Sequence, residues 1–82
     1  MTKEVGFARV KISAANIPVQ VMFEPIGTNV DLSPGEDIYL DLPLADLIAL
    51  EICVWDGGVD LVLPNPSDQV VHDERGNVIA RL

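Results

Sequence analysis

Few side chains in the sequence could carry out catalysis, and the first candidate is the single imidazole. His72 is the one histidine among the 82 residues, and Asp73 follows it directly. Neighbouring side chains of a strand project to opposite faces, so this pair does not form the oriented base of a catalytic triad unless a turn bends it back. The three serines, Ser13, Ser33 and Ser67, fall in turn-like segments, where serine commonly bonds to the backbone. The sequence therefore predicts no enzyme and no catalytic residue.

The single cysteine and the acidic pairs are the other chemical candidates. A nucleophilic cysteine needs positively charged neighbours, but the segment around Cys53 is acidic, so we interpret Cys53 as a small, half-buried hydrophobe. Asp37 with Asp41, and Asp56 with Asp60, could offer oxygen ligands to calcium, although their spacing is not that of a dedicated calcium loop. One cysteine and one histidine do not supply the usual zinc ligand set. We therefore predict no metal site and no cofactor, with calcium binding as an alternative.

Charge is the most unusual property of the chain. Thirteen acidic residues against five basic ones give a formal net charge of −8. No lysine or arginine occurs between Ile12 and Glu74, and the bases lie near the two ends of the sequence: Lys3, Arg9, Lys11, Arg75 and Arg81. Such a surface repels phosphate backbones, which argues against nucleic acid as a partner and favours a basic, apolar or cationic one.

The central element of the predicted fold is a β-hairpin at residues 48–63. Two alternating apolar runs meet there at Asp56-Gly57-Gly58. A two-residue type I′ turn at Asp56-Gly57 would set the cross-strand pairs, whereas a turn at Gly57-Gly58 would move the register by two residues and keep the faces. The pairs for the first case are Val54 with Val59, Ile52 with Leu61, and Leu50 with Leu63. Together with Ile48, these residues are predicted to face the core.

Two further segments at the start of the chain are predicted to form an antiparallel pair. Residues 3–12 and 17–24 alternate in polarity and are joined by the four residues Ser13-Ala14-Ala15-Asn16, which suggests that Ile12 lies opposite Ile17. This register places Phe7 and Met22 together as an apolar spot beside Arg9 and Lys11. We interpret that spot as either a second layer of the core or a contact patch.

The rest of the chain alternates short strands with turns. Strands are predicted at 28–32, 38–44, 69–72 and 77–82. Ser33-Pro34-Gly35-Glu36 has the proline and glycine positions of a type II turn, and Gly76 is available for a left-handed position in the last hairpin. Residues 44–47 are a connector that either tucks under the sheets or contacts another subunit. The whole pattern predicts one all-β domain over residues 1–82, a small antiparallel β-sandwich or partly open barrel of seven or eight short strands.

Size and composition favour association with a protein. A chain of 82 residues buries roughly 60–65% of the surface that its unfolded form exposes, so its stability is marginal. Neither an internal disulfide nor a zinc site is available to add stability, and 49% of the residues are hydrophobic. Oligomerisation is the remaining common solution for a small domain. We therefore expect a homo-oligomer or a protein partner.

Three turn motifs carry a resemblance to a known group of proteins. They are Phe23-Glu24-Pro25-Ile26-Gly27, Leu32-Ser33-Pro34-Gly35-Glu36 followed by an alternating strand, and Asp73-Glu74-Arg75-Gly76 before the last strand. In these motifs the chain resembles small acidic β proteins of actinobacteria whose function is not characterised. The resemblance extends over about two thirds of the chain. It implies a fold and no activity.

The start of the sequence and its apolar runs bear on location. The first residues contain no apolar signal-peptide core, and no apolar run approaches the roughly 20 residues of a membrane helix. We expect a protein without a classical signal peptide that is cytoplasmic or travels within a larger assembly, with no membrane partner.

The function that these observations favour is a non-catalytic structural or protein-interaction module. It would self-associate or form an accessory piece of a larger assembly such as a phage particle. One alternative is an acidic inhibitor of a basic-surfaced protein, and another is a small-ligand or calcium-binding β-sandwich. The proposed contact residues are Phe7, Arg9, Lys11 and Met22 on one surface, meeting Tyr39 or Trp55 on a neighbouring copy or partner.

Overall fold

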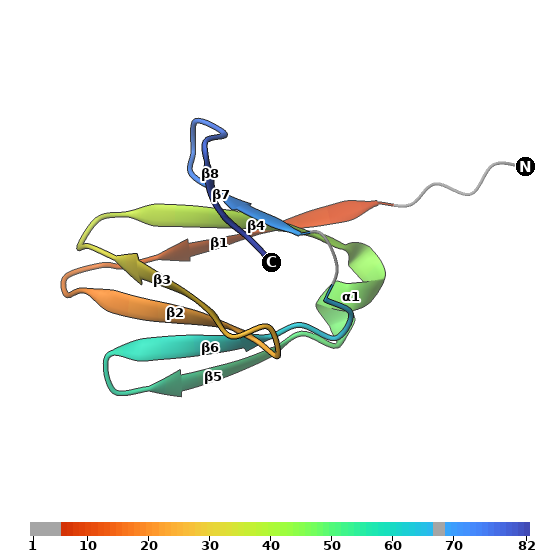
Figure 1. The fold of residues 1–82 in the computed structure, drawn as a ribbon, viewed down its shortest axis with the longest axis horizontal. Helices are drawn as coiled ribbons and strands as arrows, with labels where there is room; N and C mark the ends of the chain where they lie inside the picture. Colours follow the sequence, from red (N-terminus) through yellow and green to blue (C-terminus); the bar gives the residue numbers. More distant parts are fainter. Residues whose placement is uncertain (1–5, 67–68) are drawn as a thin grey trace, which may run out of the picture.

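The computed structural model describes residues 6–66 and 69–82, which form two facing four-stranded β-sheets (Figure 1). The elements in chain order are β1 Phe7–Ser13, β2 Val19–Glu24, β3 Thr28–Leu32, β4 Asp37–Pro43, α1 Leu44–Ile48, β5 Glu51–Trp55, β6 Gly58–Val62, β7 Val70–His72 and β8 Val78–Arg81. The predicted all-β class with seven or eight short strands is confirmed. The strands form two separate sheets and no closed barrel within these residues, which is a sandwich-like arrangement.

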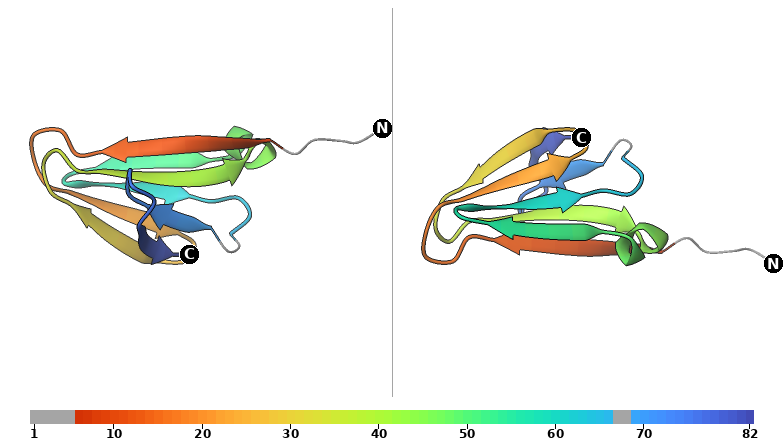
Figure 2. Two further views of the ribbon diagram at one scale, coloured as in Figure 1. Left: turned by 90° about the horizontal axis from the view of Figure 1, so that it is seen from above. Right: turned by 90° about the horizontal axis from the view of Figure 1, so that it is seen from below.

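Each side of the sandwich has two edge strands, one from each sheet. Sheet A has the order β1-β4-β7-β8 and sheet B the order β3-β2-β6-β5. β3 and β8 lie close together at one side, and both views in Figure 2 place β1 and β5 at the other. Every paired neighbour is antiparallel except β2 and β6, which are parallel. The expectation of a wholly antiparallel sandwich is therefore wrong at that one pairing.

The predicted pairing of the first two strands is also wrong. β1 pairs with β4 in sheet A, whereas β2 lies between β3 and β6 in sheet B. Ile12 is therefore opposite Ile38, and Val19 is opposite Leu32. Alternation of apolar side chains identifies which face of a strand is buried, but it does not identify the neighbouring strand. The short connection between the two strands favours a hairpin. In the structure, however, the chain crosses there from sheet A to sheet B.

This crossing is held by hydrogen bonds to a second crossing. The amide of Ala14 donates to the carbonyl of Glu36 at 3.0 Å, and the carbonyl of Ala14 accepts from the amide of Gly35 at 2.7 Å. Ala14 is buried, so these bonds satisfy backbone groups that water does not reach. The link between β1 and β2 is thus joined to the link between β3 and β4. The two connections together close one end of the sandwich.

Two of the three predicted glycine turns have the expected geometry. Gly35 has a φ of 85°, and the amide of Glu36 donates to the carbonyl of Ser33 at 3.0 Å, as a type II turn requires. Gly76 has a φ of 86° in the turn between β7 and β8. In the central hairpin, Gly57 has a positive φ and no residue other than glycine does among those described. Asp56-Gly57 is therefore the turn, but it is not type I′, which needs positive φ at both central residues.

The core lies between the sheets and draws on most strands. Its buried side chains are Ala14, Val21, Phe23, Val30, Leu32, Ile38, Leu40, Leu42, Leu61, Leu63 and Val71. The alternation predicted for residues 38–44 is correct up to Leu42, since Ile38, Leu40 and Leu42 are buried while Leu44 is exposed. Pro43 ends the strand, and its fixed φ and missing amide hydrogen suit the start of a helix.

The central hairpin keeps its predicted register but not its predicted burial. Val54 pairs with Val59 and Ile52 with Leu61. Leu61 and Leu63 are buried, and Leu50 and Val59 pack against the core while partly exposed. In contrast, the exposed fractions of Ile48, Ile52 and Val54 are 90%, 56% and 82%. The prediction that all seven residues face a closed core is therefore wrong for these three, because Ile52 and Val54 lie on the edge strand β5 and Ile48 ends the exposed helix α1.

The connector after β4 is the five-residue helix α1. Asp46 of this helix is buried, and its carboxylate accepts a hydrogen bond of 2.9 Å from the side-chain amide of Asn65. The amide of Leu44 donates to the carbonyl of Gly6 at 3.0 Å, which ties the helix to the start of β1. These contacts fix the polar side of α1 against the sandwich. Its apolar side chains, Leu44, Leu47 and Ile48, are exposed.

Candidate functional site

The outer face of sheet A carries a cluster of charged and aromatic side chains. Arg9 on β1 and Asp41 on β4 are opposite in register, and the guanidinium donates to both carboxylate oxygens at 2.9 and 3.2 Å. The guanidinium carbon also lies 5.8 Å from the centre of the Tyr39 ring, which stacks on His72 at 5.7 Å between centroids. Of the predicted contact residues, Arg9, Lys11 and Tyr39 therefore share this face. Phe7 lies at the exposed start of the same strand, with 65% of its surface accessible.

The ion pairs of this face neutralise its bases within the molecule. The hydrogen bond from Arg9 lowers the pKa of Asp41, and the same bond raises the pKa of Arg9. The ammonium group of Lys11 lies 3.8 Å from the carboxylate of Asp37. Both pairs are largely exposed, so solvent screens them. The predicted basic surface is thus a mixed surface, and Tyr39 belongs to it instead of to an opposing acidic one.

His72 has partners that sequence reasoning did not find. Its Nδ1 lies 2.8 Å from the backbone carbonyl of Asp73, so Nδ1 carries the hydrogen and donates it. Its Nε2 lies 3.7 Å from the carboxylate of Asp41. The adjacent Asp73 side chain instead accepts from the amides of Arg75 and Asn77. The described contacts of His72 are therefore with an aromatic ring, a carboxylate and a carbonyl, and a cross-strand register would have been needed to predict Asp41.

The outer face of sheet B carries the other two predicted contact residues. Met22 on β2 is opposite Asp60 on β6, and the indole N–H of Trp55 donates to the same carboxylate at 2.9 Å. Cys53 on β5 is also opposite Asp60, with its sulfur 3.7 Å from a carboxylate oxygen of Glu51. Cys53 is exposed, so its interpretation as a half-buried hydrophobe is wrong. None of the strands of sheet B contains Lys or Arg. Phe7 and Met22 therefore lie on opposite outer faces, and the predicted apolar spot beside Arg9 does not form.

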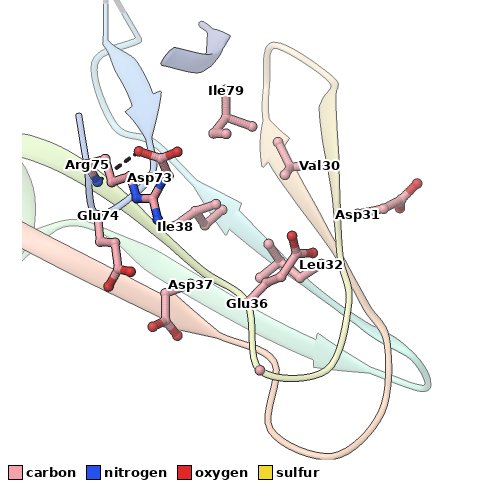
Figure 3. Close-up of a pocket in the computed structure, with 11 residues that line it drawn as sticks. Val30, Asp31, Leu32, Glu36, Asp37, Ile38, Asp73, Glu74, Arg75 and Ile79 are labelled. Carbon is pink, nitrogen blue, oxygen red and sulfur yellow. Dashed lines mark hydrogen bonds between the residues drawn. The ribbon is translucent and has the colours of Figure 1, made fainter. Parts of the chain in front are cut away.

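A pocket lies beside the turn between β7 and β8 (Figure 3). It has a volume of about 380 Å³, with Val30, Ile38 and Ile79 among its apolar lining residues. Two of the acidic side chains that line it bond locally, since Glu36 accepts from the amide of Ser33 and Asp73 accepts from Asn77. Glu36 and Asp73 therefore act as turn-forming groups.

Three of the four aspartates weighed as calcium ligands, Asp37, Asp41 and Asp60, have partners within the molecule. Asp37 and Asp41 share one strand face as predicted, but they face Lys11 and Arg9. Asp60 accepts from Trp55. Within residues 6–66 and 69–82, no three carboxylate, thiol or imidazole side chains come close enough together to hold a metal ion.

The side of the sandwich at β5 is the most distinctive surface. β5 pairs with β6 and, within the part of the chain described, with no second strand. Figure 1 shows it at the edge of sheet B that lies farthest from sheet A. Ile52 and Val54 share the inner face with buried Leu61, yet both remain exposed. We call β5 together with the apolar side of α1 (Leu44, Leu47 and Ile48) the open side.

Comparisons with known proteins do not assign the chain to a family: no protein-family model, no curated protein and no solved structure matches it. No helix among the described residues has the length and apolar character needed to span a membrane.

Proposed function

We propose that the protein is a non-catalytic structural or protein-interaction module that binds a protein partner through its open side, as a self-associating unit or as an accessory piece of a larger assembly. The observation that carries this proposal is the exposure of Ile52 and Val54, 56% and 82%, on the inner face of sheet B. Burying apolar surface is worth roughly 25 cal/mol per Å². An element that covered this face would complete the sandwich.

The two edge strands on this side differ in how they are protected. Natural edge strands avoid unwanted pairing through charged side chains, proline or bulges. β1 carries Arg9 and Lys11, whereas β5 has the sequence Glu-Ile-Cys-Val-Trp with neither a base nor a proline. The one irregularity of pairing among the described strands lies between β7 and β8. β5 is therefore less protected than β1, since its one charged side chain is Glu51 at its first residue, and this supports β5 as the binding strand.

The experiment is a capture assay with paired variants. Tagged wild-type protein and a tagged Ile52→Lys/Val54→Lys variant are each incubated with extract of the producing cells, to which untagged protein has been added. We expect the wild type to retain at least one defined protein, either the untagged copy or another chain, and the variant to lose it. If the wild type retains nothing beyond what the variant retains, the open side is not a binding surface and the proposal fails.

One observation favours a second candidate function. The outer face of sheet B presents Glu24, Asp31, Glu51 and Asp60 with no base on any of its strands. Such a face could cover a basic surface of another protein, as an acidic inhibitor does. Binding of that kind weakens as salt rises. A partner whose affinity is unchanged between low and high salt would contradict this candidate.

A further inference from the structure

We infer that the partner of the open side is a second copy of this chain, whose β5 strand pairs antiparallel with β5 to form one eight-stranded sheet across a twofold axis at Cys53. This inference rests on the proposed function and names its partner. The sheet would have the order β3-β2-β6-β5 followed by the same strands of the partner in reverse.

The backbone of β5 offers hydrogen-bonding groups in the required positions. Trp55 and Gly58 flank a two-residue turn, so they form a hydrogen-bonded pair, and the type of pair alternates from there along the hairpin. Val54 and Ile52 therefore occupy non-hydrogen-bonded pairs with β6. Their own amide and carbonyl groups point to the free edge, where a second strand can bond to them.

The strand is complementary to itself in one register. With Cys53 opposite Cys53 of the partner copy, Ile52 lies opposite the partner's Val54, and this pair makes the new hydrogen bonds. On the inner face, Leu61, Ile52 and the partner's Val54 and Val59 then form one continuous apolar row across the interface. All five residues of β5 are paired in this register. The exposed side chains of Ile52 and Val54 would then pack against apolar side chains of the partner copy.

Charge permits this register although each copy is acidic. Glu51 lies opposite the partner's Trp55, and the two Glu51 side chains are separated by about 14 Å, given roughly 3.4 Å per residue and 4.8 Å between strands. That separation exceeds the Debye length of about 8 Å at physiological ionic strength. The ring of Trp55 lies over Gly58, away from the free edge, so it leaves room for the partner's strand. No like charges are therefore directly opposite.

The first test measures mass in solution under reducing conditions. At about 100 µM we expect sedimentation to report a dimer that dissociates on dilution. Val54→Lys should give a monomer, because it places an ammonium group in the apolar row. Val78→Lys is the matched control, since Val78 is also a valine on an edge strand, is 51% exposed, and lies at the other side of the sandwich. This control should keep the wild-type mass.

The second test determines the register of the β5–β5 pairing by disulfide cross-linking of Cys53. A non-hydrogen-bonded pair separates the Cα atoms by about 4.5 Å, which lies within the disulfide range of roughly 4.4–6.8 Å. Mild oxidation should therefore give a covalent dimer of the wild-type protein. A Cys53→Ser/Ser13→Cys variant, with its thiol on β1, the edge strand of sheet A at the same side of the sandwich, should cross-link at least tenfold more slowly.

The salt dependence of dimerisation distinguishes this dimer from one joined by opposite charges. Each copy has a formal net charge of −8, so the β5 dimer should tighten as salt rises, whereas an interface of opposite charges should loosen.

The outcomes distinguish this inference from the proposed function. A wild-type protein that stays monomeric, or a dimer that persists in Val54→Lys, overturns the inference. Equal cross-linking rates for the two thiol positions overturn it as well. If a different protein is captured in a manner that requires Ile52 and Val54, the proposed function stands while the self-pairing fails.

Discussion

In the central hairpin, the indole ring of Trp55 covers Gly58, its cross-strand partner. A Cβ atom at position 58 would overlap two ring carbons of Trp55 and would also meet the backbone carbonyl oxygen of Gln20 at 2.7 Å. Gly58 is buried beneath the ring, whose N–H is held by Asp60. The ring and the neighbouring strand β2 together leave no space for a side chain at this position.

Replacing Gly58 should therefore destabilise the fold. We expect Gly58→Ala to lower the free energy of unfolding by about 1–3 kcal/mol, as overpacking does, measured by urea denaturation. A double-mutant cycle with Trp55→Ala separates the two obstacles. The cost of Gly58→Ala should fall when the ring is absent but should not vanish, because the carbonyl of Gln20 remains. Strictly additive costs would show that the ring is not an obstacle.

A second expectation concerns two residues that face each other across the hairpin. Leu61 is fully buried, whereas its partner Ile52 is more than half exposed. Leu61→Ala should lower the free energy of unfolding by about 2–5 kcal/mol, and Ile52→Ala by less than about 1 kcal/mol. Denaturation is carried out at micromolar protein concentration, so that it measures the stability of the monomer. Equal losses at the two positions would contradict the exposure of β5.

The ion pair of sheet A should contribute to stability in a pH-dependent way. The hydrogen bond from Arg9 lowers the pKa of Asp41 below its usual value of 3.8. A carboxyl group whose folded-state pKa is lowered contributes its stability above the usual pKa and loses it as pH falls through the lowered one. Asp41→Asn should therefore cost a small, constant amount near neutral pH, and the difference from wild type should disappear in acid.

Chemical denaturation from pH 7 to pH 2 measures this difference. Asp31→Asn is the control, since it removes a carboxylate from the outer face of sheet B. The cost of Asp41→Asn should also be reduced in an Arg9→Met background. A difference between Asp41→Asn and wild type that grows as the pH falls would have the wrong sign and would show that the ion pair does not lower the pKa of Asp41.

The turn between β7 and β8 should depend on one carboxylate. Asp73 accepts hydrogen bonds from the amides of Arg75 and Asn77 and from the Asn77 side chain, and these bonds lower its pKa. Asp73→Ala should therefore increase amide hydrogen exchange in β7 and β8 while leaving β2 and β6 unchanged. Glu74→Ala, in the same turn, is the control and should have no such effect. Exchange that rises throughout the molecule would indicate global unfolding instead of local loosening.

Local features of the fold could be predicted from residue types. Alternation in residues 38–42 placed Ile38, Leu40 and Leu42 in the core, because successive side chains of a strand point to opposite faces. Gly35 and Gly76 adopt positive φ where turn chemistry required it, since glycine has no Cβ to clash. The register of the central hairpin followed from its short turn. Each of these features depends on a few residues that are adjacent in sequence.

The charge cluster of sheet A illustrates what sequence patterns could and could not predict. Arg9, Lys11 and Tyr39 were identified individually, but the sequence placed Tyr39 on a different surface from the bases. Their arrangement required the pairing of β1 with β4 and of β4 with β7, which brings Asp41 and His72 beside them. Strand alternation is the same for any neighbour, so it contains no information about which of two distant strands a segment joins.

The open side was decided by tertiary structure in the same sense. The sequence determined that Ile52 and Val54 share a face with Leu61, and the structure has that face. Whether the face is covered depends on the position of β5 at the edge of sheet B and on its distance from sheet A, and both are set by the crossings between sheets. An alternating strand therefore specifies the direction of its apolar side chains, whereas the packing of the two sheets determines how much of that apolar surface water still reaches.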